Sequence, residues 1–304
     1  MLSDYGFVRV AAASPRVRVA DVDYHVARIR SLMKEAASRQ IAVVFPELSL
    51  TGYTCGDLLL QPALTRAAEE GLMQLLACAG PAIAIVGLPV MAGGRLFNCA
   101  AVIGQGTLLG VVPKLHIPDS REFCERRWFA PGTLAPKTVR LCGREVPMGC
   151  DLVFESERFS FAIEICEDMW SPNPPSGRLA QMGAQILFNP SASNETVAKH
   201  PYRRGLIAMQ SGRCIAGYVY AGAGTGESTT DLVFGGYTAV YENGTALAEG
   251  ARFSQDDVLT AADVDVGRLL YLRSRNAGFF EGNTEPGRRI PFEAADASDG
   301  TLLR

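Results

Sequence analysis

Continuous apolar runs alternate with apolar positions at helical spacing along most of the chain. Residues 41–45 (IAVVF) form an uninterrupted apolar run, which is the pattern of a strand buried on both faces. Residues 22–37 and 61–79 instead carry apolar side chains at intervals of three and four, which predicts amphipathic helices. Further predicted strands and helices follow as far as residue 273. This alternation predicts an α/β fold in which helices cover a mixed sheet core.

The alternation stops near residue 274. We therefore expect residues 1–273 to form a single domain, because they hold nearly all of the predicted strands and helices. From residue 274 onward Gly, Asn, Pro and Arg dominate and apolar residues become sparse. Residues 274–304 are therefore predicted to be a linker or arm that leads toward another domain.

Composition excludes several classes of protein. The 304 residues carry a net charge of −3, which gives no reason to expect nucleic acid or an anionic membrane as a partner. The first residues lack a signal-peptide pattern, and no apolar run approaches the roughly 20 residues of a membrane span, so we expect a cytoplasmic protein. The eight cysteines include no C-x-x-C pair, and the three histidines show no zinc-binding spacing. No metal site is predicted.

A reactive residue follows each of three predicted strands. Glu47 comes after the run at 41–45, Lys114 after LLGVVP, and Cys166 after FAIEI. Because open α/β sheets place their chemistry at the carboxyl ends of strands, we expect the three side chains to meet. Taken singly, Cys166 fits a buried thiol, and Glu47 and Lys114 fit solvated charges. Their combination is what favours an active site.

These three residue types suit the hydrolysis of a carbon–nitrogen bond. A carboxylate such as Glu47 can take the proton of the Cys166 thiol as it attacks an amide. An ammonium such as Lys114, together with backbone N–H groups, can stabilise the resulting oxyanion. His116 offers a Cys–His protease as an alternative, but no second orienting motif accompanies it, so we interpret it as a structural residue.

Three segments around these residues resemble the signature segments of the nitrilase superfamily. They are residues 45–59 (FPELSLTGYTCGDLL), 113–127 (PKLHIPDSREFCERR) and 164–170 (EICEDMW). In particular, they resemble the glutaminase domain of glutamine-dependent NAD synthetases, as does the stretch GYVYAGAGTGESTTDL from residue 217. The resemblance extends over residues 7–270. It implies an α-β-β-α sandwich that hydrolyses the side-chain amide of glutamine to glutamate and ammonia through a cysteine thioester.

The resemblance also implies a role for each site residue. Cys166 would be the nucleophile, Glu47 the general base and Lys114 the group that stabilises the tetrahedral intermediate. The backbone N–H of Glu167 would be an oxyanion donor. Glu122 would correspond to a second glutamate that positions the substrate or Lys114. The residues expected to contact the substrate are Tyr53, Ser120, Glu122, Glu167 and Ser193.

The chain departs from these synthetases in two respects. Where they often carry tyrosines after the lysine, this chain has Ser120 and Cys124, a change that bears on substrate recognition. The S-G-G-x-D-S loop of a synthetase domain is absent from the 304 residues. We therefore expect L-glutamine as the substrate, a C-terminal NAD synthetase domain as a partner, and a homo-oligomer. No cofactor is expected for this domain, since ATP and Mg would belong to the synthetase domain.

Two other interpretations remain open at this point. The chain could be a stand-alone amidase or carbamoylase that acts on another small amide, for which the change at Ser120 is the main support. It could also be a catalytically idle assembly module, although the set of Glu47, Lys114 and Cys166 argues against that.

Overall fold

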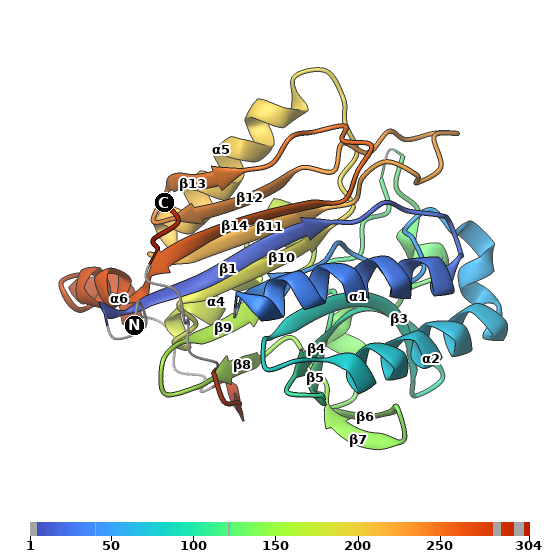
Figure 1. Cartoon of the computed structure of the whole chain (residues 1–304), viewed down its shortest axis with the longest axis horizontal. Coiled ribbons are helices and arrows are strands. Elements are labelled where there is room, and N and C mark those ends of the chain that lie inside the picture. The colour runs from blue at the N-terminus through green and yellow to red at the C-terminus, as the bar shows by residue number, and fades with distance from the viewer. Residues whose placement is uncertain (1–4, 40, 121, 282–286, 295–300) are drawn as a thin grey trace.

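Two β-sheets stack face to face, and helices cover both outer faces of the pair (Figure 1). This arrangement is seen in a computed structural model, which describes residues 5–39, 41–120, 122–281, 287–294 and 301–304. The predicted α-β-β-α sandwich is confirmed. β6 (Thr138–Leu141) and β7 (Arg144–Pro147) form a separate hairpin, which the sequence pattern did not reveal.

The first sheet contains six strands of mixed direction. β1 pairs in parallel with β2 and antiparallel with β14, while β3, β4 and β5 are joined by antiparallel pairing. The strand order is β14 (Val258–Asp265), β1 (Phe7–Ser14), β2 (Ala42–Val44), β3 (Ala84–Ala92), β4 (Arg95–Gly104), β5 (Thr107–Pro113).

The second sheet contains seven strands and carries the predicted cysteine. β9, β10 and β11 are parallel at its centre. The strand order is β13 (Thr245–Glu249), β12 (Thr238–Glu242), β11 (Gly217–Gly222), β10 (Ile186–Ser191), β9 (Ser160–Ile163), β8 (Leu152–Glu155), β15 (Arg288–Pro291).

The helices complete the outer layers. Side chains of α1 and α2 pack on the first sheet, and those of α3, α4 and α5 pack on the second. The α-helices are α1 (Val22–Ser38), α2 (Pro62–Cys78), α3 (Glu167–Trp170), α4 (Pro175–Gln181), α5 (Lys199–Arg213) and α6 (Val266–Ser274). Short 3-10 helices occur at η2 (Gly56–Leu60), η3 (Glu125–Arg127), η4 (Gly132–Leu134) and η5 (Ala277–Phe280).

The apolar run at 41–45 shows why the sheets are buried on both sides. Val43 and Phe45 belong to the apolar cluster beneath α1 and α2. Ala42 and Val44 belong to the cluster between the two sheets. Since successive side chains of a strand point to opposite faces, a strand between two apolar layers needs an uninterrupted apolar run.

The predicted linker or arm at 274–304 packs against the domain wherever the structure describes it. β15 adds a parallel strand beside β8 at the edge of the second sheet, and Phe292 joins the cluster between the sheets. The N–H of Leu303 donates to Asp263 Oδ2 at 2.7 Å. The sequence pattern missed this strand because four residues are too few to show a period.

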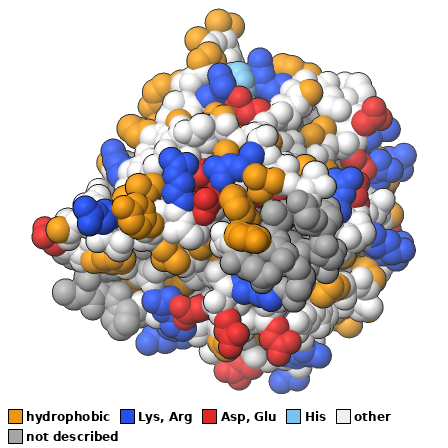
Figure 2. Space-filling model, turned by 60° about the vertical axis from the view of Figure 1, so that its left-hand side comes forward, with side chains coloured by type: hydrophobic (Ala, Val, Ile, Leu, Met, Phe, Trp, Pro, Cys, Tyr) orange, Lys and Arg blue, Asp and Glu red, His pale blue; other side chains and the backbone are white. Residues whose placement is uncertain are grey.

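The outer surface carries hydrophobic side chains in separate groups among charged ones on the face shown in Figure 2. At the end of the molecule that carries α6, the exposed hydrophobic side chains include Leu270 and Tyr271 of that helix and Phe280 of η5. Within the described residues, no helix is both long enough and apolar enough to cross a membrane.

Candidate active site

Three strand ends deliver the predicted reactive residues. Glu47 follows β2, Lys114 follows β5 directly, and Cys166 follows β9 after two residues. The first two strands belong to one sheet and the third to the other. Glu47 and Lys114 are 1% exposed and Cys166 is 6% exposed, so this chemistry lies between the sheets and not on the surface.

The turn that carries Glu47 packs tightly against β3. Leu48 has a left-handed backbone with φ of 51°. A Cβ added at Gly87 would lie 2.3 Å from the Leu48 nitrogen and 2.6 Å from the Pro46 oxygen. Such an approach leaves no room for any side chain at position 87. The glycine therefore allows β3 to hold the turn that carries Glu47.

Lys114 binds two buried carboxylates. Its Nζ lies 2.6 Å from Glu47 Oε1 and 2.6 Å from Glu125 Oε1. The side-chain amide of Asn98 also donates to Glu47 Oε1 at 2.6 Å. Burial alone would lower the pKa of Lys114, but Glu125 and Glu47 raise it well above its usual value. Lys114 therefore stays positively charged at neutral pH.

The glutamate at Lys114 is Glu125, whereas the sequence interpretation assigned that position to Glu122. Glu125 is 2% exposed and also accepts a hydrogen bond from the Tyr53 hydroxyl at 2.8 Å. Burial raises the pKa of Glu125, and Lys114 lowers it in part. Glu122 is exposed and instead accepts a hydrogen bond from Asn194 Nδ2 at 2.6 Å. The start of η3 at Glu125 turns this side chain inward, a turn that no pattern in the segment revealed.

Cys166 has a strained backbone at the turn into α3. Its φ of 44° and ψ of −98° are unusual for a residue with a side chain, and its N–H donates to Pro190 O at 3.0 Å. Such strain costs about 1–3 kcal/mol and is concentrated at functional sites. The neighbouring β10 thus fixes where the thiol points.

The electrostatics of Cys166 match a thiol that requires a base. Burial raises the pKa of the thiol, Glu47 raises it further, and Lys114 lowers it in part. The backbone of Ala192 also lowers it, and the Ala192 N–H donates to Glu47 Oε2 at 2.8 Å. Ala192 therefore lies beside both the thiol and the Glu47 carboxylate. At neutral pH the thiol is protonated, so attack on a substrate needs a proton acceptor.

Asp168 is a buried carboxylate that ties the lysine segment to the cysteine segment. Its Oδ2 accepts from the N–H of Ile165 at 2.8 Å, and its Oδ1 accepts from the N–H of His116 at 2.7 Å. Burial raises the pKa of Asp168 to about 7, although these backbone hydrogen bonds lower it in part. Because the two segments come from different sheets, this side chain helps set the position of Lys114 relative to Cys166.

The free energy of unfolding is expected to fall as pH rises from about 4 to about 7. In the folded protein Asp168 keeps its proton up to a pKa of about 7, against 3.8 for an unperturbed group. The folded state therefore binds more protons in this window, and raising the pH removes stability by at most about 1.4 kcal/mol per pH unit. Urea denaturation across the window should show a flatter profile for Asp168→Asn. Equal slopes in both proteins would contradict this.

A second buried carboxylate, Glu227, holds the segment that carries Tyr53. Its Oε1 accepts from the N–H of Tyr53 at 2.6 Å, and its Oε2 accepts from the N–H of Thr54 at 2.9 Å. Burial raises the pKa of Glu227. The glycine-containing loop before Glu227 therefore acts as a support for the site, and sequence reasoning did not foresee this.

The other predicted substrate contacts, Ser193, Glu167 and Ser120, differ in how deeply they are buried. Ser193 is buried immediately after Ala192, and Glu167 is half-buried at the start of α3. Ser120 is exposed, and its carbonyl accepts from the N–H of Phe123. Ser193 and Glu167 thus lie beside the buried cluster, whereas Ser120 lies at the surface.

A pocket of about 370 Å³ lies at the outer side of Tyr53. Glu122, Phe123 and Asp231 are among the residues that line it. The ring of Tyr53 lines this pocket while its hydroxyl group contacts Glu125. Tyr53 therefore connects the open pocket to the buried cluster around Lys114.

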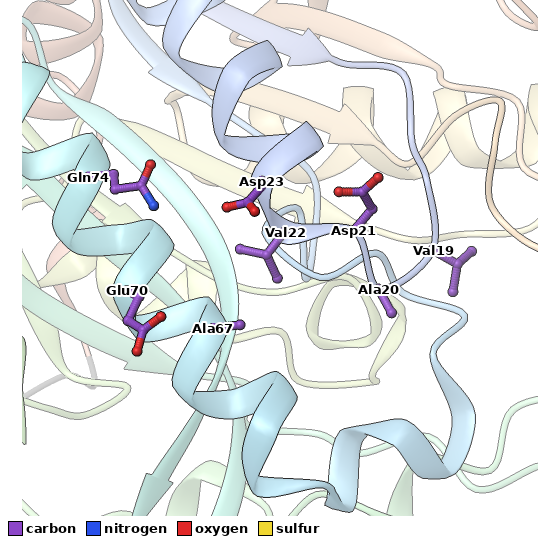
Figure 3. Close-up of a pocket in the computed structure, with 8 residues that line it drawn as sticks. All are labelled: Val19, Ala20, Asp21, Val22, Asp23, Ala67, Glu70 and Gln74. Atoms are coloured by element: carbon purple, nitrogen blue, oxygen red, sulfur yellow. The ribbon is translucent and has the colours of Figure 1, made fainter.

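Another pocket, of about 450 Å³, lies between the start of α1 and the outer face of α2 (Figure 3). Asp21, Asp23 and Glu70 give it an acidic lining. The Asp21 side chain caps α1 by accepting from the N–H of Tyr24 at 3.0 Å. None of the predicted site residues lines this pocket.

Glu164 and His116 lie near the site and are held by hydrogen bonds to neighbouring segments. Glu164 lies inside the sandwich, where the Tyr218 hydroxyl donates to Oε1 and the N–H of Ser176 donates to Oε2 at 2.8 Å. The buried carboxylate of Glu164 therefore has hydrogen-bond donors at both oxygens. The backbone N–H of His116 is held by Asp168. In the described residues, no hydrogen bond joins the His116 ring to Cys166.

Comparisons with known proteins identify relatives of this chain. The glutamine-dependent NAD(+) synthetase of Mycobacterium tuberculosis is 42% identical over 315 aligned residues, which cover 99% of this chain and 46% of the synthetase. A crystal structure of a glutamine-dependent NAD(+) synthetase from Cytophaga hutchinsonii superposes with a TM-score of 0.77 at 25% identity, over 84% of this chain and 43% of that one. The chain thus spans about half the length of these relatives.

A smaller protein shares the fold over nearly its whole length. The nitrilase-superfamily amidase of Nesterenkonia AN1 superposes with a TM-score of 0.66 at 21% identity, covering 88% of this chain and 95% of the amidase. The model of the carbon-nitrogen hydrolase family matches residues 9–270. That match includes every strand that delivers Glu47, Lys114 or Cys166, and it confirms the resemblance to the nitrilase superfamily. The chain belongs to the carbon-nitrogen hydrolase family.

Proposed function

We propose that this chain hydrolyses the side-chain amide of glutamine to glutamate and ammonia. The observation that carries the proposal is the cluster in which Lys114 binds Glu47 and Glu125, all three close enough to Cys166 to shift the pKa of its thiol. The similarity to glutamine-dependent NAD(+) synthetases supports glutamine as the substrate.

In the proposed reaction Glu47 acts as the general base and Cys166 as the nucleophile. The Cys166 sulfur forms a bond to the amide carbon while its proton passes to Glu47. The tetrahedral oxyanion is stabilised by Lys114 and by the backbone N–H of Glu167. The carbon–nitrogen bond then breaks, and ammonia leaves with the proton from Glu47. Glu47 next deprotonates a water molecule, which cleaves the thioester, releases glutamate and returns the proton to sulfur.

Lys114 needs its two carboxylates to act in this way. As a desolvated cation it would lose its proton, but Glu47 and Glu125 keep it charged. Glu125 accepts hydrogen bonds from both Lys114 and the Tyr53 hydroxyl, so its proposed part is to hold Lys114 in place. Neither carboxylate requires a cofactor for this chemistry.

Ammonia release from glutamine by the purified chain tests the proposal. Cys166→Ala is expected to reduce release by roughly 10³-fold or more, because it removes the nucleophile. Cys78→Ala is the matched control, because that thiol lies at the end of α2 and outside the cluster, and it is expected to keep the activity. Equal ammonia release by Cys166→Ala and the unchanged chain would refute the proposed mechanism.

The product ammonia suggests a larger context. By similarity to the synthetases, we propose that a C-terminal synthetase domain uses the ammonia for NAD synthesis, and that the assembly is a homo-oligomer in the cytoplasm. ATP and Mg would act only in that domain. Gel filtration of the chain with and without a synthetase domain tests this part.

A second candidate is an amidase or carbamoylase that acts on another small amide. The serine at position 120 supports it, because related synthetases often carry tyrosine in this segment. A panel of small amides in the same ammonia assay separates the two functions. Faster release from another amide than from glutamine would favour the second candidate.

A further inference from the structure

The carboxamide of Asn98 contacts both of the carboxylates that bind Lys114. Its Nδ2 donates to Glu47 Oε1 at 2.6 Å and to Glu125 Oε2 at 3.4 Å. Lys114 Nζ donates to the same oxygen of Glu47 and to the other oxygen of Glu125. The two carboxylates are therefore joined twice, once through a cation and once through a neutral amide.

Strand β4 holds Asn98 in this place. β4 lies between β3, which packs against the turn of Glu47, and β5, which Lys114 follows. The backbone carbonyl of Asn98 accepts from the N–H of Lys114 at 2.8 Å. Ala100 and Val102, two and four positions farther along β4, belong to the cluster between the sheets. Since alternate side chains of a strand share a face, the Asn98 side chain also points between the sheets.

The other end of this carboxamide has no partner. Among the described residues, no donor contacts Asn98 Oδ1, although this oxygen is buried. A buried acceptor without a donor destabilises the folded state, and an apolar side chain of similar volume would avoid that loss. Stability alone therefore does not account for an asparagine at this position, whereas its contacts with the two carboxylates do.

The other donors bind the two carboxylates nearly alike. Lys114 Nζ lies 2.6 Å from an oxygen of Glu47 and 2.6 Å from an oxygen of Glu125. Each carboxylate also has one further donor at 2.8 Å, which is the Ala192 N–H for Glu47 and the Tyr53 hydroxyl for Glu125. The number and length of these bonds therefore do not favour a negative charge on one carboxylate over the other.

Asn98 does distinguish the two carboxylates. A hydrogen bond of 2.6 Å to a carboxylate is strong, whereas one of 3.4 Å is weak. A neutral donor stabilises the charged form of the carboxylate that it contacts more closely. Burial raises the pKa of Glu125 to about 7, while Lys114 lowers it in part and Glu47 raises it. Glu125, the carboxylate with the weaker amide contact, thus takes up a proton near neutral pH.

We propose that Asn98 is a positioning residue that keeps the negative charge of this carboxylate pair on Glu47. When the pair takes up one proton, the proton resides on Glu125. The inference rests on the proposed function, in which ionised Glu47 accepts the proton of Cys166. It adds that a neutral amide, and not the shared ammonium of Lys114, determines which carboxylate serves as the base.

The rate at which iodoacetamide alkylates Cys166, measured against pH, tests the inference without a substrate. Alkylation of the Cys166→Ala chain is subtracted to remove the reaction of the other thiols. The substitution Asn98→Leu changes only an uncharged side chain. The titratable groups that face Glu47 stay in place: Lys114, Glu125, Tyr53, Cys166, Glu167 and Glu227.

Asn98→Leu is expected to move the acidic limb of this profile to higher pH by roughly one to two units, because the charged base loses a donor. The rate should fall roughly 10-fold or more at pH 6 and stay within about threefold of the unchanged chain at pH 9. Ammonia release from glutamine should show the same limb, with kcat lowered and KM changed less than about twofold.

Glu125→Gln provides the second half of a double-mutant cycle. In that variant Lys114 pairs with one carboxylate only, so Glu47 should stay ionised with or without the amide. Adding Asn98→Leu to Glu125→Gln should therefore lower the alkylation rate at pH 6 by less than about threefold. A merely structural role for Asn98 would produce the same loss in both backgrounds.

Val102→Ala is the matched control, because it removes buried volume from the same face of β4 without touching a carboxylate. It should leave the acidic limb in place even if it lowers the urea midpoint. Should Asn98→Leu fail to fold, the smaller Asn98→Ala is judged by the same criteria. A limb that stays in place, or an equal loss at pH 6 and pH 9, would overturn the inference and leave the proposed hydrolysis intact. Unchanged ammonia release by Cys166→Ala would instead contradict the proposed function.

Discussion

Replacing Lys114 with methionine is expected to remove both activity and a large part of the stability. The ammonium lies 2.6 Å from an oxygen of Glu47 and 2.6 Å from one of Glu125, and all three side chains are buried. Breaking such a cluster from one side leaves uncompensated buried charge and costs about 3–5 kcal/mol. Loss of the group proposed to stabilise the oxyanion should lower kcat by roughly 10²- to 10³-fold.

Urea denaturation and the ammonia assay measure the two effects separately. The double variant Lys114→Met with Glu125→Gln removes one of the stranded carboxylates and is expected to recover part of the stability but none of the activity. Lys34→Met is the exposed control. A loss of less than about 1 kcal/mol in the single variant would mean that the carboxylates do not depend on Lys114 for their charge.

Changing Glu47 to glutamine is expected to lower kcat by roughly 10²- to 10⁴-fold while leaving the chain folded. The amide has nearly the same shape as the carboxylate. Its oxygen can still accept from Lys114 and Asn98, which in the unchanged chain donate to Glu47 Oε1 at 2.6 Å. It cannot accept the proton of Cys166, whose pKa is raised by burial. The thiol should then react only as the pH approaches that raised pKa.

Glu125→Gln is the matched comparison, because it neutralises the other carboxylate on the same ammonium. It is expected to reduce kcat less than Glu47→Gln does, since Glu47 raises the pKa of the Cys166 thiol more strongly than Glu125 does. Activity and the alkylation rate of Cys166, each measured against pH, distinguish the two variants. Equal losses in both would contradict the assignment of Glu47 as the base.

The layers of the fold could be predicted from the chain because central strands such as β2, β9, β10 and β11 are buried on both faces. The run at 41–45 became β2 (Ala42–Val44), and the helical spacing at 22–37 became α1 (Val22–Ser38). The pattern failed for β15 (Arg288–Pro291), where four residues between polar neighbours show no period and only pairing with β8 makes a strand.

The reactive residues could also be found from the sequence, because functional residues of open α/β sheets lie at the carboxyl ends of strands. Sequence order alone suggested Glu47, Lys114 and Cys166. It could not choose between Glu122 and Glu125, which differ by three positions in a segment with little regular structure. The η3 turn at Glu125 decides that choice by pointing its carboxylate to Lys114 and leaving Glu122 at the surface.

The sequence by itself therefore determined the layered fold and the residue types at the strand ends, because these depend on local periodicity. It indicated the family through three segments that resemble the family's signature segments. Tertiary structure alone decided which carboxylates surround Lys114, how Asp168 and Glu227 brace the site, and how Asn98 contacts both Glu47 and Glu125. Those contacts join segments far apart in the chain, and their geometry depends on how the two sheets pack, which no local pattern encodes.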